Sequence, residues 1–228
     1  FSVNAQTGGT TSFGFLDLAY NARSLALGTD FISIRDQDLN LGVGNPSLIN
    51  EKMHNRASFN QALLAGGINY GMVNYGRAFK EGVVGVGHLR YVDYGKMTRR
   101  DEFGDDLGIF KPMDMILGAS VAKPFSPRLN VGLTLNFIYS QLAAFSSLGA
   151  SIDFAGNYFN EDKGFLATVL VKNAGYQLKG YTKKTHDPLP VDLQFAVSKK
   201  LAHAPFRFSL LAHNLNRWDL SYNDPNAK

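Results

Sequence analysis

A stretch of acidic and amide side chains near the N-terminus carries residue types that bind calcium in other proteins. Asp36-Gln37-Asp38-Leu39-Asn40-Leu41-Gly42 offers the carboxylate and amide oxygens that calcium prefers. An EF-hand loop has glycine at its sixth position and glutamate at its twelfth, whereas here glycine is seventh and Ser47 is twelfth. These departures favour the alternative, a polar turn whose Asp and Asn side chains bond nearby backbone groups.

A glycine-rich stretch further along the chain begins like a dinucleotide-binding fingerprint. In Gly85-Val86-Gly87-His88-Leu89-Arg90 the third glycine of that motif is missing, the residues alternate as in a strand, and no helix opens after them. Glycines in a strand also let a sheet bend or another backbone approach closely. We therefore expect a strand here and no phosphate ligand.

Ser209, His213 and Asn214 are residue types of a hydrolytic triad, but their spacing on a strand keeps them apart. Ser209 and His213 would share a face at a separation of roughly 13 Å, beyond the hydrogen-bond contact that a nucleophile and its base require. The remaining histidines show no metal-binding spacing: His54, His88, His186 and His203. The chain has no cysteine. We expect no catalytic, cofactor-binding or metal-binding residues and no enzyme.

Two charged stretches, Thr98 to Asp106 and Lys179 to His186, could bind a partner. The alternative is that they are solvated loops without a role. Long loops are where binding residues concentrate in barrel proteins, so docking of a partner stays open here.

The composition indicates that strands position these residues. The 228 residues include 23 Gly, 17 Phe and 10 Tyr but only 18% charged residues, a balance typical of β proteins. The net charge of +4 is diffuse, which argues against nucleic acid. No window reaches the roughly 18 to 20 apolar residues of a membrane-spanning helix, so a membrane location would require a barrel.

Nine segments alternate between apolar and polar residues with the period of a strand. In the clearest segment, the odd positions from Leu129 to Phe137 are Leu, Val and Phe, and the even positions between them are Asn, Gly and Thr. The segments are 57–64, 67–79, 83–94, 113–123, 129–140, 147–159, 164–173, 191–200 and 206–215. A soluble β carrier would show the same alternation with its apolar face inward, and fractionation with detergent would separate the two classes.

Connection lengths favour an antiparallel transmembrane β-barrel. The links after the second, fourth, sixth and eighth segments are short, those after the third and seventh are long, and the one after the fifth is intermediate. Short turns at the periplasmic rim and long extracellular loops are typical of outer-membrane barrels. This parity places the N-terminus in the periplasm, although the short link Ala65-Gly66 after the first segment departs from it.

The predicted barrel divides the chain into four parts. Residues 1–6 have the character of the end of an export signal, 7–55 of a periplasmic or plug segment, and 56–216 of the wall. Nine strands do not close a barrel, because bacterial outer-membrane barrels have even strand numbers and no open edge. We therefore expect an incomplete barrel, with 217–228 beginning a truncated C-terminal part.

Several motifs are similar to a family of long-chain-fatty-acid-transporter-like (PorV-like) outer-membrane barrels of Bacteroidetes. Asn21 to Gly28 contains an A-R-x-x-A-L-G stretch, followed by Asp36 to Asn40 and by Asn45-Pro46-Ser47-Leu48, where Ser47 replaces the usual Ala. Further pieces resemble the type IX secretion system barrels of that family: 53–55, 67–71, 94–96, 188–190, 198–207, 211–215 and 218–220.

The resemblance implies a non-enzymatic, integral outer-membrane component of the attachment complex. Such a barrel anchors a PorZ-like surface partner, while PorV-like relatives carry cargo to the transpeptidase-like PorU. Its partners would be outer-membrane lipid and these secretion proteins. The alternative within the family is transport of fatty acids or other hydrophobic ligands, with the N-terminal segment gating the lumen.

Overall fold

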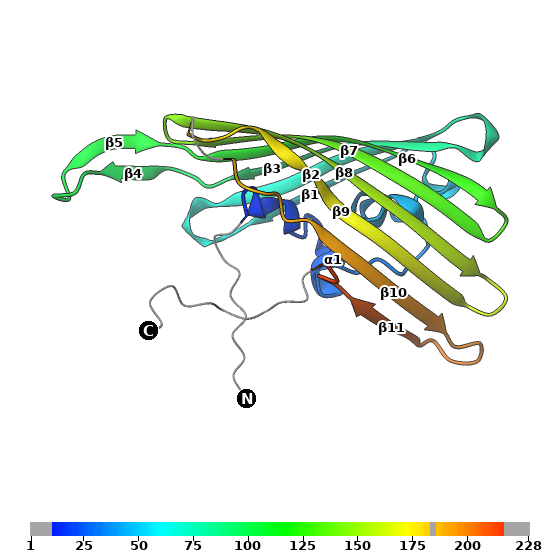
Figure 1. Ribbon diagram of the computed structural model, residues 1–228. Coiled ribbons are helices and arrows are strands. Elements are labelled where there is room, and N and C mark those ends of the chain that lie inside the picture. The colour runs from blue at the N-terminus through cyan, green and yellow to red at the C-terminus, as the bar shows by residue number, and fades with distance from the viewer. Residues whose placement is uncertain (1–10, 183–185, 217–228) are drawn as a thin grey trace, which may run out of the picture.

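Nine antiparallel strands form one curved sheet in the computed structural model, which describes residues 11–182 and 186–216 (Figure 1). The order in the sheet follows the chain, β1-β2-β3-β6-β7-β8-β9-β10-β11. Their bounds are β1 Arg56–Leu63, β2 Asn69–Ala78, β3 Val84–Asp93, β6 Met113–Ser126, β7 Leu129–Leu142, β8 Phe145–Asn160, β9 Phe165–Lys179, β10 Asp192–Lys200 and β11 Arg207–Ala212. All nine predicted segments are therefore strands.

The stretch between β3 and β6, expected to be a loop, contains a second small sheet. Strands β4 (Met97–Arg100) and β5 (Asp106–Phe110) pair as a hairpin that extends beyond the main sheet (Figure 1). The Asp101 carboxylate closes its turn by accepting the backbone N–H groups of Phe103 and Asp105, both at 2.9 Å. These strands contain only four and five residues, too few for the alternation pattern to reveal them.

Two other connections differ from expectation because single residues adopt left-handed backbone. Strand β9 continues to Lys179, past the predicted end at residue 173. Asn173, at φ 57°, forms an irregularity opposite β8 that interrupts the alternation at this point. Its N–H donates to the Asp153 carboxylate at 2.7 Å. The link between β7 and β8, expected to be of intermediate length, is a two-residue turn with Ala143 at φ 52°. Positive φ is uncommon outside glycine, so neither feature shows in the sequence.

The sheet turns its apolar face outward and its polar face inward. On β7, Leu133, Leu135 and Phe137 are exposed on the convex side, whereas Thr134 and Asn136 are buried on the concave side. The other long strands repeat this arrangement. The alternation is thus confirmed, and its direction is the reverse of that in a soluble sandwich.

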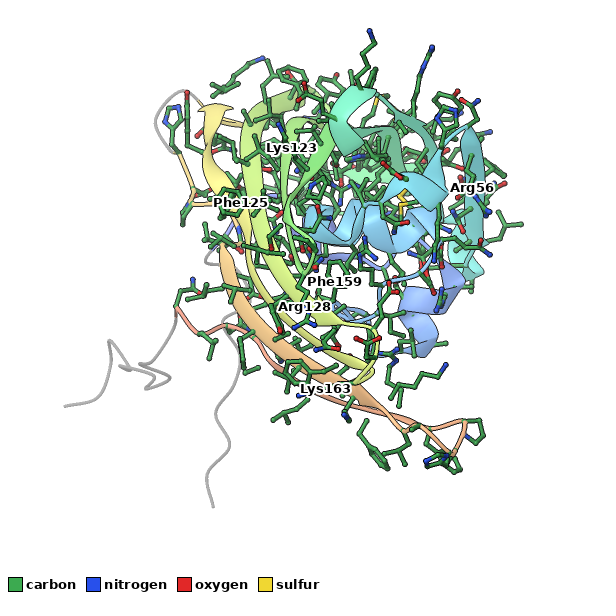
Figure 2. All side chains as sticks on the ribbon, turned by 90° about the vertical axis from the view of Figure 1, so that its right-hand side faces the viewer. Arg56, Lys123, Phe125, Arg128, Phe159 and Lys163 are labelled. Atoms are coloured by element: carbon green, nitrogen blue, oxygen red, sulfur yellow. The ribbon has the colours of Figure 1, made fainter. Side chains whose placement is uncertain are left out.

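The N-terminal part lies on the concave side of the sheet, where Figure 2 shows the wall curving around it. It consists of short helices joined by extended chain: η1 Gly14–Asp17, α1 Ala22–Ala26, α2 Leu39–Gly44, η2 Pro46–Leu48 and η3 Glu51–Met53. Two further single turns, η4 Ala65–Gly67 and η5 Lys80–Gly82, connect strands. Phe13, Leu16 and Ile49 pack with inward residues such as Ile116 and Ile138 to form the main apolar cluster.

Strands β1 and β11 are the two edges of the sheet and do not pair with each other, so the described residues form no closed barrel. Among these residues no helix has the length and apolar character that would let it cross a membrane. The predicted signal remnant 1–6 and C-terminal part 217–228 lie outside the described residues.

Candidate functional site at the inner face of the sheet

The turn η2 is the point at which the N-terminal segment attaches to the wall. Asn45 caps this turn, accepting the Ser47 N–H at 3.1 Å, and its own amide donates to the Ile32 carbonyl at 2.9 Å. From β7, the amide of Asn130 donates to the carbonyls of Ser47 at 2.6 Å and Ile49 at 2.9 Å. From β8, Asn157 donates to the same Ser47 carbonyl. Two strands therefore hold one backbone turn.

A glycine makes this close approach possible. Gly132 lies on the inner face of β7 between Asn130 and Thr134, directly below η2. A Cβ at this position would lie 2.6 Å from Ser47 N and closer still to the Pro46 carbonyl. Any other residue at position 132 would push the turn off the wall.

The acidic stretch Asp36 to Gly42 is the polar turn favoured above. Asp36 accepts the Asp38 N–H at 2.8 Å, and Asp38 caps α2 by accepting the Asn40 N–H at 3.0 Å. Arg23 pairs with both carboxylates at 2.7 and 2.9 Å. Asn40 accepts hydrogen bonds from Ser58 on β1 and from other inward side chains. These oxygens are therefore engaged within the protein, and the described residues contain no cluster of His and acidic side chains that could hold a metal.

A small polar cavity of about 60 Å³ lies between the N-terminal segment and the inner wall. Its charged lining comes from both: Asp17, Asp30, Arg90, Asp153 and Lys172. Lys172 Nζ lies 3.4 Å from Asp30 and 3.7 Å from Asp17, so an ion-pair network ties β9 to the segment. The volume admits a few water molecules and is well below the roughly 300–1,000 Å³ of small-molecule sites.

Burial at this cavity shifts the pKa values of the segment's own groups. Desolvation raises the pKa of the Asp17 carboxyl, and nearby Lys172 opposes that rise. Desolvation likewise raises the pKa of the Tyr20 phenol. The Tyr20 ring lies 5.6 Å from the Arg90 guanidinium, which also donates to Asn136 at 3.2 Å. Such groups hold the segment against the wall.

A larger groove of about 630 Å³ borders edge strand β1. It is strongly charged, since Arg23, Arg35, Asp36, Lys52 and Arg56 line it. It is therefore unsuited to a hydrophobic ligand.

The other stretches whose residue types could do chemistry do not come together in the structure. Gly85 to Arg90 is part of β3, as expected, with His88 buried against Asn136 at 3.2 Å. Ser209 lies within β11, whereas His213 follows it and contacts Asn214 at 2.8 Å. His54 accepts the Ala78 N–H at 3.0 Å. In the stretch Lys179 to His186, Lys179 donates to Ser146 at 2.8 Å, and residues 183–185 lie outside the described part.

Replacing either asparagine that binds η2 is expected to lower the stability of the protein measurably. Asn157→Ala removes one of the two donors to the Ser47 carbonyl, which Asn130 still satisfies, whereas Asn130→Ala leaves the Ile49 carbonyl without its donor. Asn157→Ala is therefore expected to destabilise the protein by about 0.5–1.5 kcal/mol, the net worth of one hydrogen bond, and Asn130→Ala by about 1–3 kcal/mol, the effect of leaving a buried polar group unpaired. Urea unfolding would measure it. Gln61→Ala, at an exposed position on β1, is the control and should change stability by less than about 0.5 kcal/mol; an equal change in all three variants would contradict this role.

Comparison with known proteins gives no further information on this site. No family model matches the chain, and no curated protein matches it.

Proposed function

We propose that this chain forms wall and plug of an integral outer-membrane β-barrel that acts without catalysis, as a component of the type IX secretion system. The observation that supports a membrane location is that the outer face of the sheet is apolar and its inner face is polar. Polar residues such as Thr134, Asn157 and Gln194 are fully buried inside, while large apolar side chains cover the outside. Outer-membrane barrels have this arrangement in lipid, whereas in water it would expose a continuous apolar face of a kind that monomeric soluble proteins rarely show.

The lengths of the strands fit the proposed bilayer. Strands β6 to β9 contain 14 to 16 residues, more than the roughly 9–11 that cross the hydrocarbon core when tilted. The convex face presents apolar side chains on every long strand; the large exposed ones include Leu117, Leu135, Phe154, Val169 and Phe195. An outer-membrane location with the turns β2–β3, β6–β7, β8–β9 and β10–β11 at the periplasmic rim is part of the proposal, although the two-residue β7–β8 turn lies on the other rim, where longer loops were expected.

The secretion role rests on the sequence motifs, which resemble PorQ within the type IX secretion barrels. In that role the protein would anchor a PorZ-like surface partner. The β4–β5 hairpin is the best candidate for the contact, because it extends beyond the wall on the side opposite the β2–β3, β6–β7, β8–β9 and β10–β11 turns (Figure 1). Its apolar side chains are accessible, with Phe103 83% and Ile109 69% exposed.

The hairpin makes the anchoring role testable. The variant Phe103→Ser, Leu107→Ser, Ile109→Ser removes its apolar contacts, and we expect surface retention of the PorZ-like partner to fall at least about tenfold, equivalent to 1.4 kcal/mol. The matched control is Leu142→Ser, Phe145→Ser, at the neighbouring β7–β8 turn on the same rim. Retention that stays unchanged in the hairpin variant, with equal barrel levels, would exclude this hairpin as the docking site.

Transport of fatty acids, the alternative, has less support. The cavity between segment and wall is small and polar, and the larger groove is lined by charged side chains. Neither of these two spaces offers the apolar path that an acyl chain requires.

A further inference from the structure

One rim of the sheet is strongly basic. It is formed by the turns β2–β3, β6–β7, β8–β9 and β10–β11 and the outward residues beside them, and we call it the turn rim. Six exposed cationic side chains lie there: Arg77, Lys80, Lys123, Arg128, Lys163 and Lys199. Lys200 and Arg207, at the ends of β10 and β11, lie on the inner face, where Arg207 donates to Ser198 at 2.9 Å. Against the six cations of the turn rim stand three acids, Glu81, Glu161 and Asp162.

The opposite rim has no such excess among the described residues. Its connections and strand ends carry five cations, Lys96, Arg99, Arg100, Lys111 and Lys179. They also carry seven acids, Asp93, Asp101, Glu102, Asp105, Asp106, Asp187 and Asp192. The diffuse charge of +4 in the sequence therefore conceals an uneven distribution in space.

The basic side chains continue the apolar outer face. On β6, the outward residues Leu117, Ala119 and Val121 are followed by Lys123 and Phe125, both exposed. Figure 2 shows Lys123, Phe125, Arg128 and Lys163 at this end of the strands. On β10, Lys199 follows outward Phe195 and Val197 in the same way. Long cationic side chains at the end of an apolar band reach from the hydrocarbon to the head groups of a bilayer.

Aromatic side chains accompany the cations. Phe79, Phe125, Tyr158, Phe206 and Phe208 are exposed at or beside the same ends of β2, β6, β8 and β11. Aromatic side chains gather at the boundary between hydrocarbon and head groups. The internal pairing of the cations is weak, since Lys123 lies 3.5 Å from Glu81 but both are highly exposed.

We propose that the turn rim binds the anionic head groups of glycerophospholipids in the leaflet where it lies. The inference rests on the proposed membrane insertion and adds a lipid preference to it. The cations are spread along the rim between aromatic side chains, which fits a plane of phosphate groups better than a compact macromolecular ligand. Each basic residue near an anionic surface strengthens binding about fivefold, an effect that salt screens.

The test compares two variants that lose the same charge. The rim variant carries Lys80→Gln, Lys123→Gln, Arg128→Gln, Lys163→Gln and Lys199→Gln. The control variant carries Lys96→Gln, Arg99→Gln, Arg100→Gln, Lys111→Gln and Lys179→Gln on the opposite rim. Insertion of each full chain is measured by co-flotation with phosphatidylcholine vesicles, alone or containing phosphatidylglycerol, and in a third arm containing lipopolysaccharide.

We expect the native chain and the control to prefer the phosphatidylglycerol vesicles at least about tenfold, and the rim variant to lose that preference while still entering phosphatidylcholine vesicles. Salt at about 1 M, where the screening length is about 3 Å, should abolish the preference. Equal preference in both variants, or a stronger preference for lipopolysaccharide, would overturn the lipid assignment alone. A native chain that floats with no vesicle would overturn membrane insertion, and the lipid assignment with it.

Discussion

Leu135→Arg is expected to prevent stable insertion of the protein into bilayers. Leu135 lies midway along β7 on the convex face and is 53% exposed, between outward-facing Leu133 and Phe137. An arginine at the midplane of a transmembrane barrel costs about 2–4 kcal/mol, which lowers the folded fraction in lipid by roughly 30- to 1,000-fold. Urea titration of folding into vesicles would measure this loss.

The same substitution has a different outcome if the convex face lies in water. There an exposed Leu135→Arg would change stability by less than about 0.5 kcal/mol and would improve solubility. Ile109→Arg is the matched control, because Ile109 is 69% exposed but lies on the β4–β5 hairpin beyond the wall. Equal behaviour of the two variants in vesicles would rule out the lipid-facing assignment.

Gly132→Ala is expected to detach the N-terminal segment from the wall. The added methyl group would overlap the backbone of Pro46 and Ser47, and this backbone cannot move without breaking the hydrogen bonds from Asn130 and Asn157. Overpacking of this kind destabilises proteins by about 1–3 kcal/mol. Urea unfolding would measure the change, and limited proteolysis would show earlier cleavage within residues 11–55.

Gly156→Ala is the control, and it should have the opposite sign. Gly156 is on the outer face of β8, opposite Val131 of β7, and an added Cβ would meet nothing within 4 Å. Replacing an unconstrained strand glycine by alanine stabilises a protein by about 0.5–1 kcal/mol. Destabilisation of the same size in both variants would mean that strand geometry, and not contact with η2, explains the effect.

The strands could be predicted from sequence because each one alternates over many residues. The nine segments from Ala57 to Leu215 show this pattern, and local alternation needs no knowledge of distant parts of the chain. Alternation alone does not give the direction of the faces, since the same period serves an inward or an outward apolar face; the connection lengths, which favoured a transmembrane barrel, indicated an outward one. The β4–β5 hairpin and the extension of β9 past Asn173 were missed, because the hairpin strands are too short to show the pattern and a left-handed asparagine interrupts it in β9.

The attachment site could be predicted only in part. Alternation places Asn130 and Gly132 on the polar face of their strand, and the Asn45-Pro46 dipeptide indicates a turn. Nothing in the sequence joins that turn to residues 83 and 110 positions away. The requirement for glycine at position 132 arises only when the two backbones meet.

The long separation between Ser47 and Asn157 has a consequence for biogenesis. The N-terminal segment is synthesised first, yet the surface that receives it does not exist until β7 and β8 have been made and have paired. Contacts this distant in sequence form slowly. Phe13, Leu16 and Ile49 therefore lack their native neighbours throughout this interval. Apolar side chains left exposed in this way favour aggregation until the wall has formed.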